Sequence, residues 1–473
     1  MPKDKKINKK FRFPHVLVIM FLLILFSCLL TYIVPAGDFD YTNDGELIPG
    51  TYHSIEQSPV NPIYALTLIL DGGNQASSII VLVLFMGGFI GGILQLDSVG
   101  KVINYLLQKL VKVSSNVLIL GMFLLMGAIG FFVGGDFMIA FVPLGVLLAK
   151  KLRLDPITAL AITFLPLFLA YSLSPSGMAD NGQIIAGIPL YSGYGIRVII
   201  FLIFMAVTSI HITLYTKKVR KNPLKSTMNN QYWIKELDEA DEDQLNIDSS
   251  QKVTWQDAAV LFILMISPVI LAIGNTALGW SEAYGSLNTA IAVFFLGFVL
   301  CYLLKRKSMD DMVAAFTKGI QDMVLVAIII ILATTVSVIL QEGNILSTIV
   351  NLMTNSMSEL PVGISSIFIF IISAIFNFIV PSGSGLLGVM IPILQPVAEL
   401  LGMSTQVLIT SLTFGGGLTD LIVPTLGATM GAIVLAKANY LSWLKFMVPL
   451  YIIWVIVGFG ILYYLASIGW VGY

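Results

Sequence analysis

Uncharged apolar runs of about twenty residues recur along this chain, and they limit its fold more than any other feature. An α-helix needs a run of that length to cross the hydrocarbon core of a bilayer. The chain is 57% hydrophobic and 11% charged, whereas a soluble domain carries about a quarter charged residues. The sequence therefore predicts an all-α polytopic protein of the cytoplasmic membrane.

The placement of lysine and arginine predicts how the chain crosses the bilayer. The basic segment 1–14 should be cytoplasmic, and the acidic loop 35–62 should face outside. The pattern gives about nine crossing helices and a C-terminus outside. Segment 216–256 begins basic and turns acidic, and its composition supplies no hydrophobic core. We expect it to be a cytoplasmic polar linker between two halves.

The two halves of the sequence repeat each other. Pro143 and Pro392 differ by 392 − 143 = 249 positions, and Pro175 and Pro424 by the same number. Chance alignment of apolar segments is the alternative, but prolines and glycines in register favour a duplication. An odd number of predicted crossings separates the copies, 15–215 and 257–473, so the second should be inverted. Inverted repeats with a binding site at their interface are typical of secondary transporters.

Each repeat contains an apolar run that small residues interrupt, and the charges place both ends of each run on one side. We therefore expect two re-entrant helical hairpins, at about 116–151 and about 361–401. Non-helical backbone is tolerated at membrane depth only where protein or a water-filled cavity covers it. Glycine lets such a turn bring its backbone close to a solute. The candidate solute-binding residues at the turns are Gly134, Gly135, Ser382, Gly383 and Ser384.

Each repeat also contains a crossing helix that a proline breaks, at Pro175 and at Pro424. Proline removes a backbone hydrogen bond. The freed N–H groups suit a carboxylate, and the freed carbonyls suit a cation. A packing kink is the alternative, because proline is common in transmembrane helices, but matching breaks favour a site. The candidate solute-binding residues at the breaks are Ser172, Ser174, Ser176, Gly177, Thr419 and Thr425.

Three acids are expected at membrane depth, where ionisable residues are functional candidates. Asp136 lies at a hairpin turn, Asp420 lies beside the second break, and Asp180 follows the first break. Asp136 and Asp420, with Thr413, are candidates to hold Na⁺ or the amine of a solute. Asp180 has the alternative of being a solvated acid in an aqueous vestibule.

No lysine or arginine falls at the predicted depth of the site. Arg197 and Lys437 are expected to be interfacial anchors whose charged ends reach the membrane surface. A solute with two carboxylates would therefore have to be held by helix dipoles, hydroxyls and bound cations. This balance favours an amino acid over a dicarboxylate.

Other classes of protein fit the sequence less well. Two cysteines and three scattered histidines provide neither a disulfide framework nor the spacing of a metal site. No constellation suited to catalysis is evident, so we expect no enzyme and no cofactor other than Na⁺ as a coupling ion. A net charge of −1 implies no attraction to nucleic acid. An ion channel stays open as an alternative, although no ring of like groups is evident.

Four stretches resemble a known family. They are "TYIVPAGDF", "FVPLG", "SPSG" and "IVPTLGATMGAIVLAKANYLSWLKFM". They look like the YfcC-type carriers of the four-carbon-dicarboxylate anaerobic carrier family, within the ion transporter superfamily. The resemblance covers nearly the whole chain and implies inverted repeats, re-entrant hairpins and secondary transport. In related members it also implies elevator motion, cation coupling and homodimers.

The resemblance implies a carrier without fixing its solute, because the family includes dicarboxylate carriers and arginine–ornithine exchangers. The exchangers carry a Glu-Glu pair where this chain has Asp136 and Phe137, and Asn where it has Ser174 and Asp420. We expect secondary active transport of a small solute that carries a carboxylate. The expected solute is an amino acid, and exchange of basic amino acids is one form that this transport would take. Transport would be coupled to Na⁺, H⁺ or a counter-solute. A dicarboxylate is the alternative.

Overall fold

The computed structural model is almost entirely helical in the residues that it describes. The described residues are 16–40, 48, 51–109, 114–132, 136–175, 177–228, 233–234, 253–355, 360–379 and 381–472. Their one sheet is a two-stranded antiparallel ribbon of β1 (Gly37–Asp38) and β2 (His53–Ser54). The expected all-α fold is confirmed.

The helices fall into two series along the chain. The first series is α1 (Val16–Ile33), α2 (Pro62–Thr67), α3 (Ile69–Gln75), α4 (Ser77–Gln95), α5 (Asp97–Lys109), α6 (Ser115–Phe132), η1 (Asp136–Phe141), α7 (Val142–Lys151), α8 (Pro156–Ile162), α9 (Phe164–Leu173), α10 (Met178–Ile185), α11 (Tyr194–Lys221) and η2 (Pro223–Lys225). The second series is α13 (Trp255–Ala277), α14 (Trp280–Tyr284), α15 (Ser286–Leu304), α16 (Met309–Glu342), α17 (Leu346–Asn355), α18 (Val362–Ile379), α19 (Gly383–Leu400), α20 (Thr405–Asp420), α21 (Gly427–Leu435) and α22 (Tyr440–Ser467).

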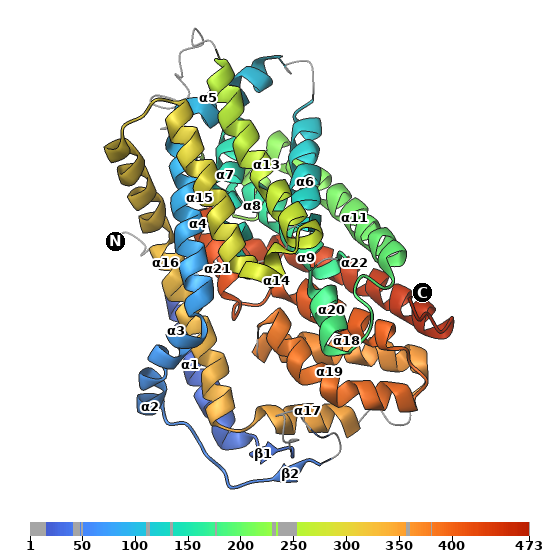
Figure 1. The fold of residues 1–473 in the computed structure, drawn as a ribbon. Coiled ribbons are helices and arrows are strands. Elements are labelled where there is room, and N and C mark those ends of the chain that lie inside the picture. The colour runs from blue at the N-terminus through green and yellow to red at the C-terminus, as the bar shows by residue number, and fades with distance from the viewer. Residues whose placement is uncertain are drawn as a thin grey trace, which may run out of the picture.

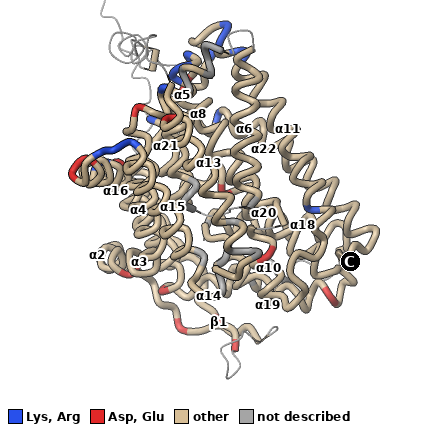
Figure 2. Tube along the Cα trace, turned by 45° about the horizontal axis from the view of Figure 1, so that its top comes forward, with Lys and Arg blue, Asp and Glu red and all other residues tan. Residues whose placement is uncertain are grey.

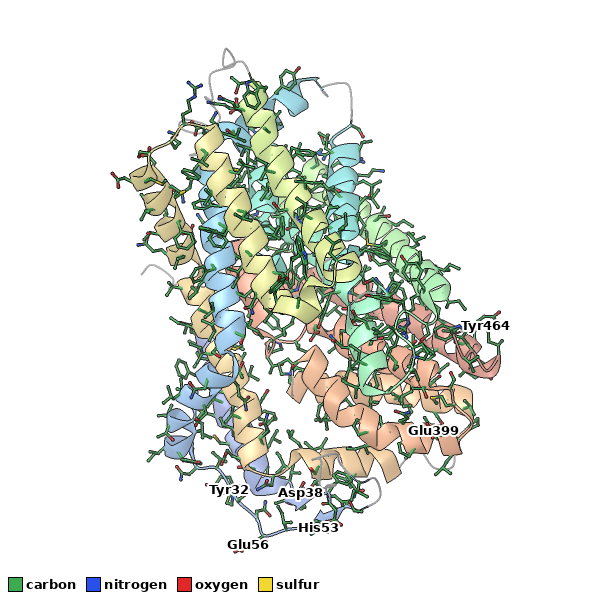
Figure 3. The ribbon with its side chains drawn as sticks, in the orientation of Figure 1. Tyr32, Asp38, His53, Glu56, Glu399 and Tyr464 are labelled. Atoms are coloured by element: carbon green, nitrogen blue, oxygen red, sulfur yellow. The ribbon has the colours of Figure 1, made fainter. Side chains whose placement is uncertain are left out.

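Six candidate spans in the described residues are long and apolar enough to cross a membrane, and five further apolar helices are shorter. Figure 2 shows lysine and arginine gathered around α5 and the loop before α16, together with some acidic residues, while the opposite end near β1 is acidic. Figure 3 places Asp38, Glu56 and Glu399 toward that acidic end. The chain is therefore a multi-pass membrane protein with most of its described basic residues toward one end. Which end is cytoplasmic stays a prediction.

Helices α4 and α16 cross at glycines and form a frame on one side of the molecule (Figure 1). A Cβ added to Gly319 of α16 would lie 2.9 Å from the Cα of Gly88 in α4. Only glycine allows two helices to approach this closely, because a side chain would collide with the partner's backbone. Gln95 of α4 also donates from Nε2 to the carbonyl oxygen of Ala315, at 3.0 Å.

The hairpin of the second half, α18 and α19, packs against α20 and forms a second body. Asn377 Nδ2 of α18 donates to the carbonyl oxygen of Gly416 in α20, at 3.1 Å. A Cβ added to Gly415 would lie 2.2 Å from the carbonyl oxygen of Phe370. Helix α17, which precedes this hairpin in the chain, runs across one end of the molecule (Figure 1). The hairpin and α20 are thus held together by backbone contacts that small residues permit.

The starts of corresponding helices recur with the shift of 249 found in the sequence. Helix α8 begins at Pro156 and α20 at Thr405; α10 begins at Met178 and α21 at Gly427. In each half a broken helix is followed by one long helix, α11 or α22, and the first predicted hairpin turn lies outside the described residues. The inverted placement of the two copies in a membrane stays a prediction.

The loop that leads from α1 to α3 contains structure that the sequence did not reveal. The loop contains β1, β2 and α2, and it also makes hydrogen bonds to the end of α16. Ser58 Oγ donates to the carbonyl oxygen of Glu342 at 3.0 Å, and Asn344 Nδ2 donates to Ser58 Oγ at 2.9 Å. These bonds fix the end of α16, which borders the candidate site.

Candidate functional site

A cavity of about 320 Å³ lies between the frame and the second body. One wall comes from α3, the start of α4 and one face of α16. The opposite wall comes from the start of α19 and from the break between α20 and α21, and α9 supplies a third side. The cavity therefore joins the hairpin turn and the proline break of the second half, as a solute site between repeats requires.

Four of the residues predicted for the site line this cavity: Ser382, Gly383, Asp420 and Thr425. Ser382 is the N-cap of α19, and its Oγ accepts from the backbone N–H of Gly385, which also lines the cavity. Thr425 Oγ1 donates to the carbonyl oxygen of Phe378, at 2.9 Å, and so links the break to the hairpin. The hairpin turn and the break thus form one continuous surface.

Five other predicted residues do not line the cavity: Ser172, Ser174, Gly177, Thr413 and Thr419. Ser172 and Thr413 donate within their own helices, to the carbonyl oxygens of Phe168 and Thr410, because a buried hydroxyl is readily satisfied one turn back. Ser174 is fully buried. Thr419 Oγ1 pairs with the hydroxyl of Tyr451 at 2.8 Å, and Gly177 N donates to Asp180.

The remaining predictions fall where the structure makes no statement. Gly134, Gly135 and Ser176 lie outside the described residues, as do the side chains of Asp136 and Ser384. They stay predictions.

Asp420 is the only carboxylate among the described residues that line the cavity, and no lysine, arginine or histidine joins it. Its side chain is 2% exposed, and Oδ1 accepts from Asn377 Nδ2 at 2.7 Å. The amide oxygen of Asn377 is buried and has no hydrogen-bond partner among the described residues. Asn377 meets the carboxylate through its amide nitrogen and does not itself line the cavity, so the carboxylate of Asp420 is the group suited to a cation or an ammonium group.

The backbone carbonyls at this break were expected to be available to a cation, but three of them already accept hydrogen bonds from side chains. The carbonyl oxygens of residues 420, 421 and 422 accept from Thr429 Oγ1 at 2.6 Å, Trp443 Nε1 at 2.7 Å and the hydroxyl of Tyr440 at 2.6 Å. Side chains thus replace the helical hydrogen bonds that the break removes. The carboxylate of Asp420 stays the predicted cation-binding group at this break.

Two helices start at the cavity. Helix α19 begins at Gly383, and α21 begins at Gly427 with no side-chain hydrogen bond capping its first turn. Gly427 and Ala428 line the cavity. The first N–H groups of a helix have no partner within it and carry the positive end of its dipole, so they favour a carboxylate. The site thus combines two helix N-termini with one acid.

Sequence reasoning missed the residues that α9, α3 and α16 contribute. Phe168 and Tyr171 of α9 line the cavity, and the Tyr171 hydroxyl would lie 2.9 Å from a Cβ on Gly383. Gln75 and Gln341 line it from the frame. Two signals were present: Tyr171 lies 249 positions before Asp420, and Gln341 closes the repeated "ILQ" that ends α4 and recurs in α16.

Arg197 is not the interfacial anchor that the sequence suggested. Its side chain is 2% exposed, lies over the ring of Trp470 at 5.9 Å and donates from Nη2 to Gln406 Oε1 at 2.9 Å. The planar guanidinium can stack and donate at once, which allows its burial. Arg197 therefore holds the start of α11 to α20 and to the C-terminal residues, away from the cavity.

The fold defines a polytopic membrane protein, and its family identifies it as a transporter. The chain belongs to the C4-dicarboxylate anaerobic carrier family, DcuC, which matches residues 13–467. The recognition of this family from sequence is confirmed.

Individual relatives are distant but match over nearly their whole length. YfcC of Escherichia coli, provisionally described as a basic amino acid antiporter, is 25% identical over 93% of this chain and 94% of its own. An uncharacterized protein of Haemophilus influenzae is 23% identical over 95% and 96%. MtrF of Neisseria gonorrhoeae, assigned to a class of antimetabolite efflux pumps, superimposes with a TM-score of 0.47 and 16% identity over 97% and 96%.

Proposed function

We propose that this protein is a secondary active transporter that moves a small amino acid across the cytoplasmic membrane. The observation that carries the proposal is the cavity, which combines one buried carboxylate, Asp420, with the N-termini of α19 and α21. An amino acid presents the complementary pair of groups, an ammonium and a carboxylate. A volume of about 320 Å³ lies at the lower end of the range for small-molecule sites, which suits a small solute.

The motion we propose is an elevator movement of the second body against the frame. The cavity lies at the boundary between the two, so displacement of one body would carry the solute-binding turn and break past α16. The hydrogen bonds from Asn377 to Gly416 and from Thr425 to Phe378 support movement of the hairpin and α20 as one unit.

Coupling is proposed to a cation or to a counter-solute. The carboxylate of Asp420 offers oxygens to Na⁺, and protonation of Asp420 would provide H⁺ coupling instead. Exchange of one amino acid for another is supported by the description of the Escherichia coli relative. A homodimer is part of the proposal through the family resemblance alone.

A dicarboxylate carrier is the second candidate, because the family takes its name from four-carbon dicarboxylates. A second carboxylate on the solute would face Asp420 or the amide and hydroxyl groups of the frame. It would need a bound cation for charge balance, since the described lining contains no lysine or arginine.

Counterflow in proteoliposomes tests the proposal. Vesicles are loaded with one unlabelled solute and given the same labelled solute outside, with and without Na⁺. The panel covers basic, acidic, neutral polar and apolar amino acids, with succinate as the dicarboxylate. We expect trans-accelerated uptake of an amino acid. Uptake of succinate alone would establish the second candidate, and conductance without saturation would indicate a channel.

A further inference from the structure

The frame side of the cavity carries a polar stripe that transport of a generic amino acid does not require. Thr334, Ser337 and Gln341 line the cavity from α16, at spacings of three and four residues. Residues so spaced lie on one face of a helix. Gln75, the last residue of α3, lines the cavity beside them. Neither the family assignment nor any relative's description gives this stripe a role.

The two glutamines contact each other in a way that leaves complementary groups for a ligand. Gln75 Nε2 donates to Gln341 Oε1 at 3.3 Å. A carboxamide has two N–H donors and one oxygen acceptor, so the pair still offers the Gln75 oxygen and the Gln341 N–H groups. This set of one acceptor and one donor group is what a second carboxamide needs in order to bind through both of its ends.

A solute with a charged side chain matches this wall less well than a solute with a carboxamide. A carboxylate only accepts and an ammonium or guanidinium only donates, so each would leave half of the pair's capacity unmatched. The wall also places no ionised group, among its described residues, against a side-chain charge. Asp420, on the opposite wall, is engaged with the solute amine or the coupling cation in the function proposed above.

We propose that Gln75 and Gln341 determine specificity and that the solute is an amino acid with a carboxamide side chain, glutamine or asparagine. The inference rests on the proposed function and narrows it. The α-carboxylate lies at the helix N-termini, the amine faces Asp420, and the side-chain carboxamide binds the glutamine pair. A site built from such groups rejects solutes that lack the matching hydrogen bonds more strongly than an apolar pocket would.

The test measures the ratio of glutamine to arginine counterflow in proteoliposomes. Wild-type protein should exchange glutamine, or asparagine, at least about tenfold faster than arginine. Gln341→Glu should lower that ratio at least about tenfold, because a carboxylate cannot donate to the solute carboxamide and pairs well with a guanidinium. Gln95→Glu is the matched control, since Gln95 occupies the same place in the other "ILQ" and binds Ala315 instead of the cavity. Its ratio should stay at the wild-type value.

A second variant covers the case in which Gln341→Glu fails to fold. Gln341→Met keeps the length of the side chain and removes the amide, so the ratio of glutamine to alanine counterflow should fall at least about fivefold. Exchange of arginine in preference to glutamine and asparagine, or ratios that neither Gln341 variant changes, would overturn the inference and leave the proposed function intact. Failure of folded wild-type protein to exchange any amino acid would overturn both.

Discussion

The two proline breaks occupy corresponding places in the two halves, but different side-chain hydrogen bonds support the backbone at each break. At the second break, Thr429, Tyr440 and Trp443 bind three successive carbonyls. At the first, Asp180 caps the N–H of Gly177 at the start of α10, and Ser172 bonds within α9. The second break is held open by three side chains from two helices, α21 and α22, which keeps it in a defined shape beside the cavity.

The residues that face the cavity from the two breaks also differ. Tyr171 and Asp420 are separated by the same 249 positions as the paired prolines, and both line the cavity. One half supplies a phenol packed edge-on against Phe168, with ring centroids 5.8 Å apart, and the other supplies the acid. Among the described lining residues, the second break therefore supplies the ionisable group and the first supplies an aromatic one.

The largest expected effect concerns the acid of the second break. Asp420→Asn removes the charge that binds the cation or the amine but keeps the shape and the contact with Asn377. Loss of a charged hydrogen-bonding group costs about 1.5–3 kcal/mol, so counterflow should fall about tenfold or more and lose its dependence on Na⁺ or pH. Asp180→Asn, at the first break, is the control and should keep that dependence. Unchanged ion dependence in Asp420→Asn would remove this acid from the coupling mechanism.

A smaller effect is expected from a substitution at Gly383, where the hairpin of α18 and α19 meets the first break. A Cβ at Gly383 would lie 2.9 Å from the Tyr171 hydroxyl and 3.2 Å from Cε of Met178. Gly383→Leu would push a side chain against these groups, at a cost of about 1–3 kcal/mol, and should abolish the protection that solute gives against thermal unfolding. Gly388→Leu is the matched control in the same helix, because a Cβ there meets nothing within 4 Å. Normal protection in Gly383→Leu would place the hairpin turn outside the solute site.

The smallest effect is expected from the bonds that hold the second break open. Tyr440→Phe removes the donor to the carbonyl oxygen of Ile422 and should destabilise the protein by about 1 kcal/mol. Thermal unfolding should show a Tm lower by about 2 °C. Tyr191→Phe, at the corresponding place in the first half, should leave Tm unchanged, since its ring is 40% exposed. Equal losses in the two variants would show that the halves are supported alike.

Much of the fold follows from the sequence. The hairpin predicted at about 361–401 contains α18 and α19, and the breaks predicted at Pro175 and Pro424 fall between α9 and α10 and between α20 and α21. Long apolar runs and prolines act locally, through helix length and a lost backbone hydrogen bond, so no knowledge of packing is needed. The amphipathic α5 and α17, and the ribbon of β1 and β2, were not foreseen because contacts distant in sequence hold them in place.

The site divides in the same way. The sequence by itself determined that this protein crosses a membrane, that its chain breaks at two prolines, and that Asp420 stands beside one of them. Only the tertiary structure decided which polar residues face the solute, bringing Gln75, Tyr171 and Gln341 to the cavity and turning Thr413 away from it. The reason is that the face a helix presents to a cavity depends on which neighbours cover its other faces, and packing across distant segments sets those neighbours.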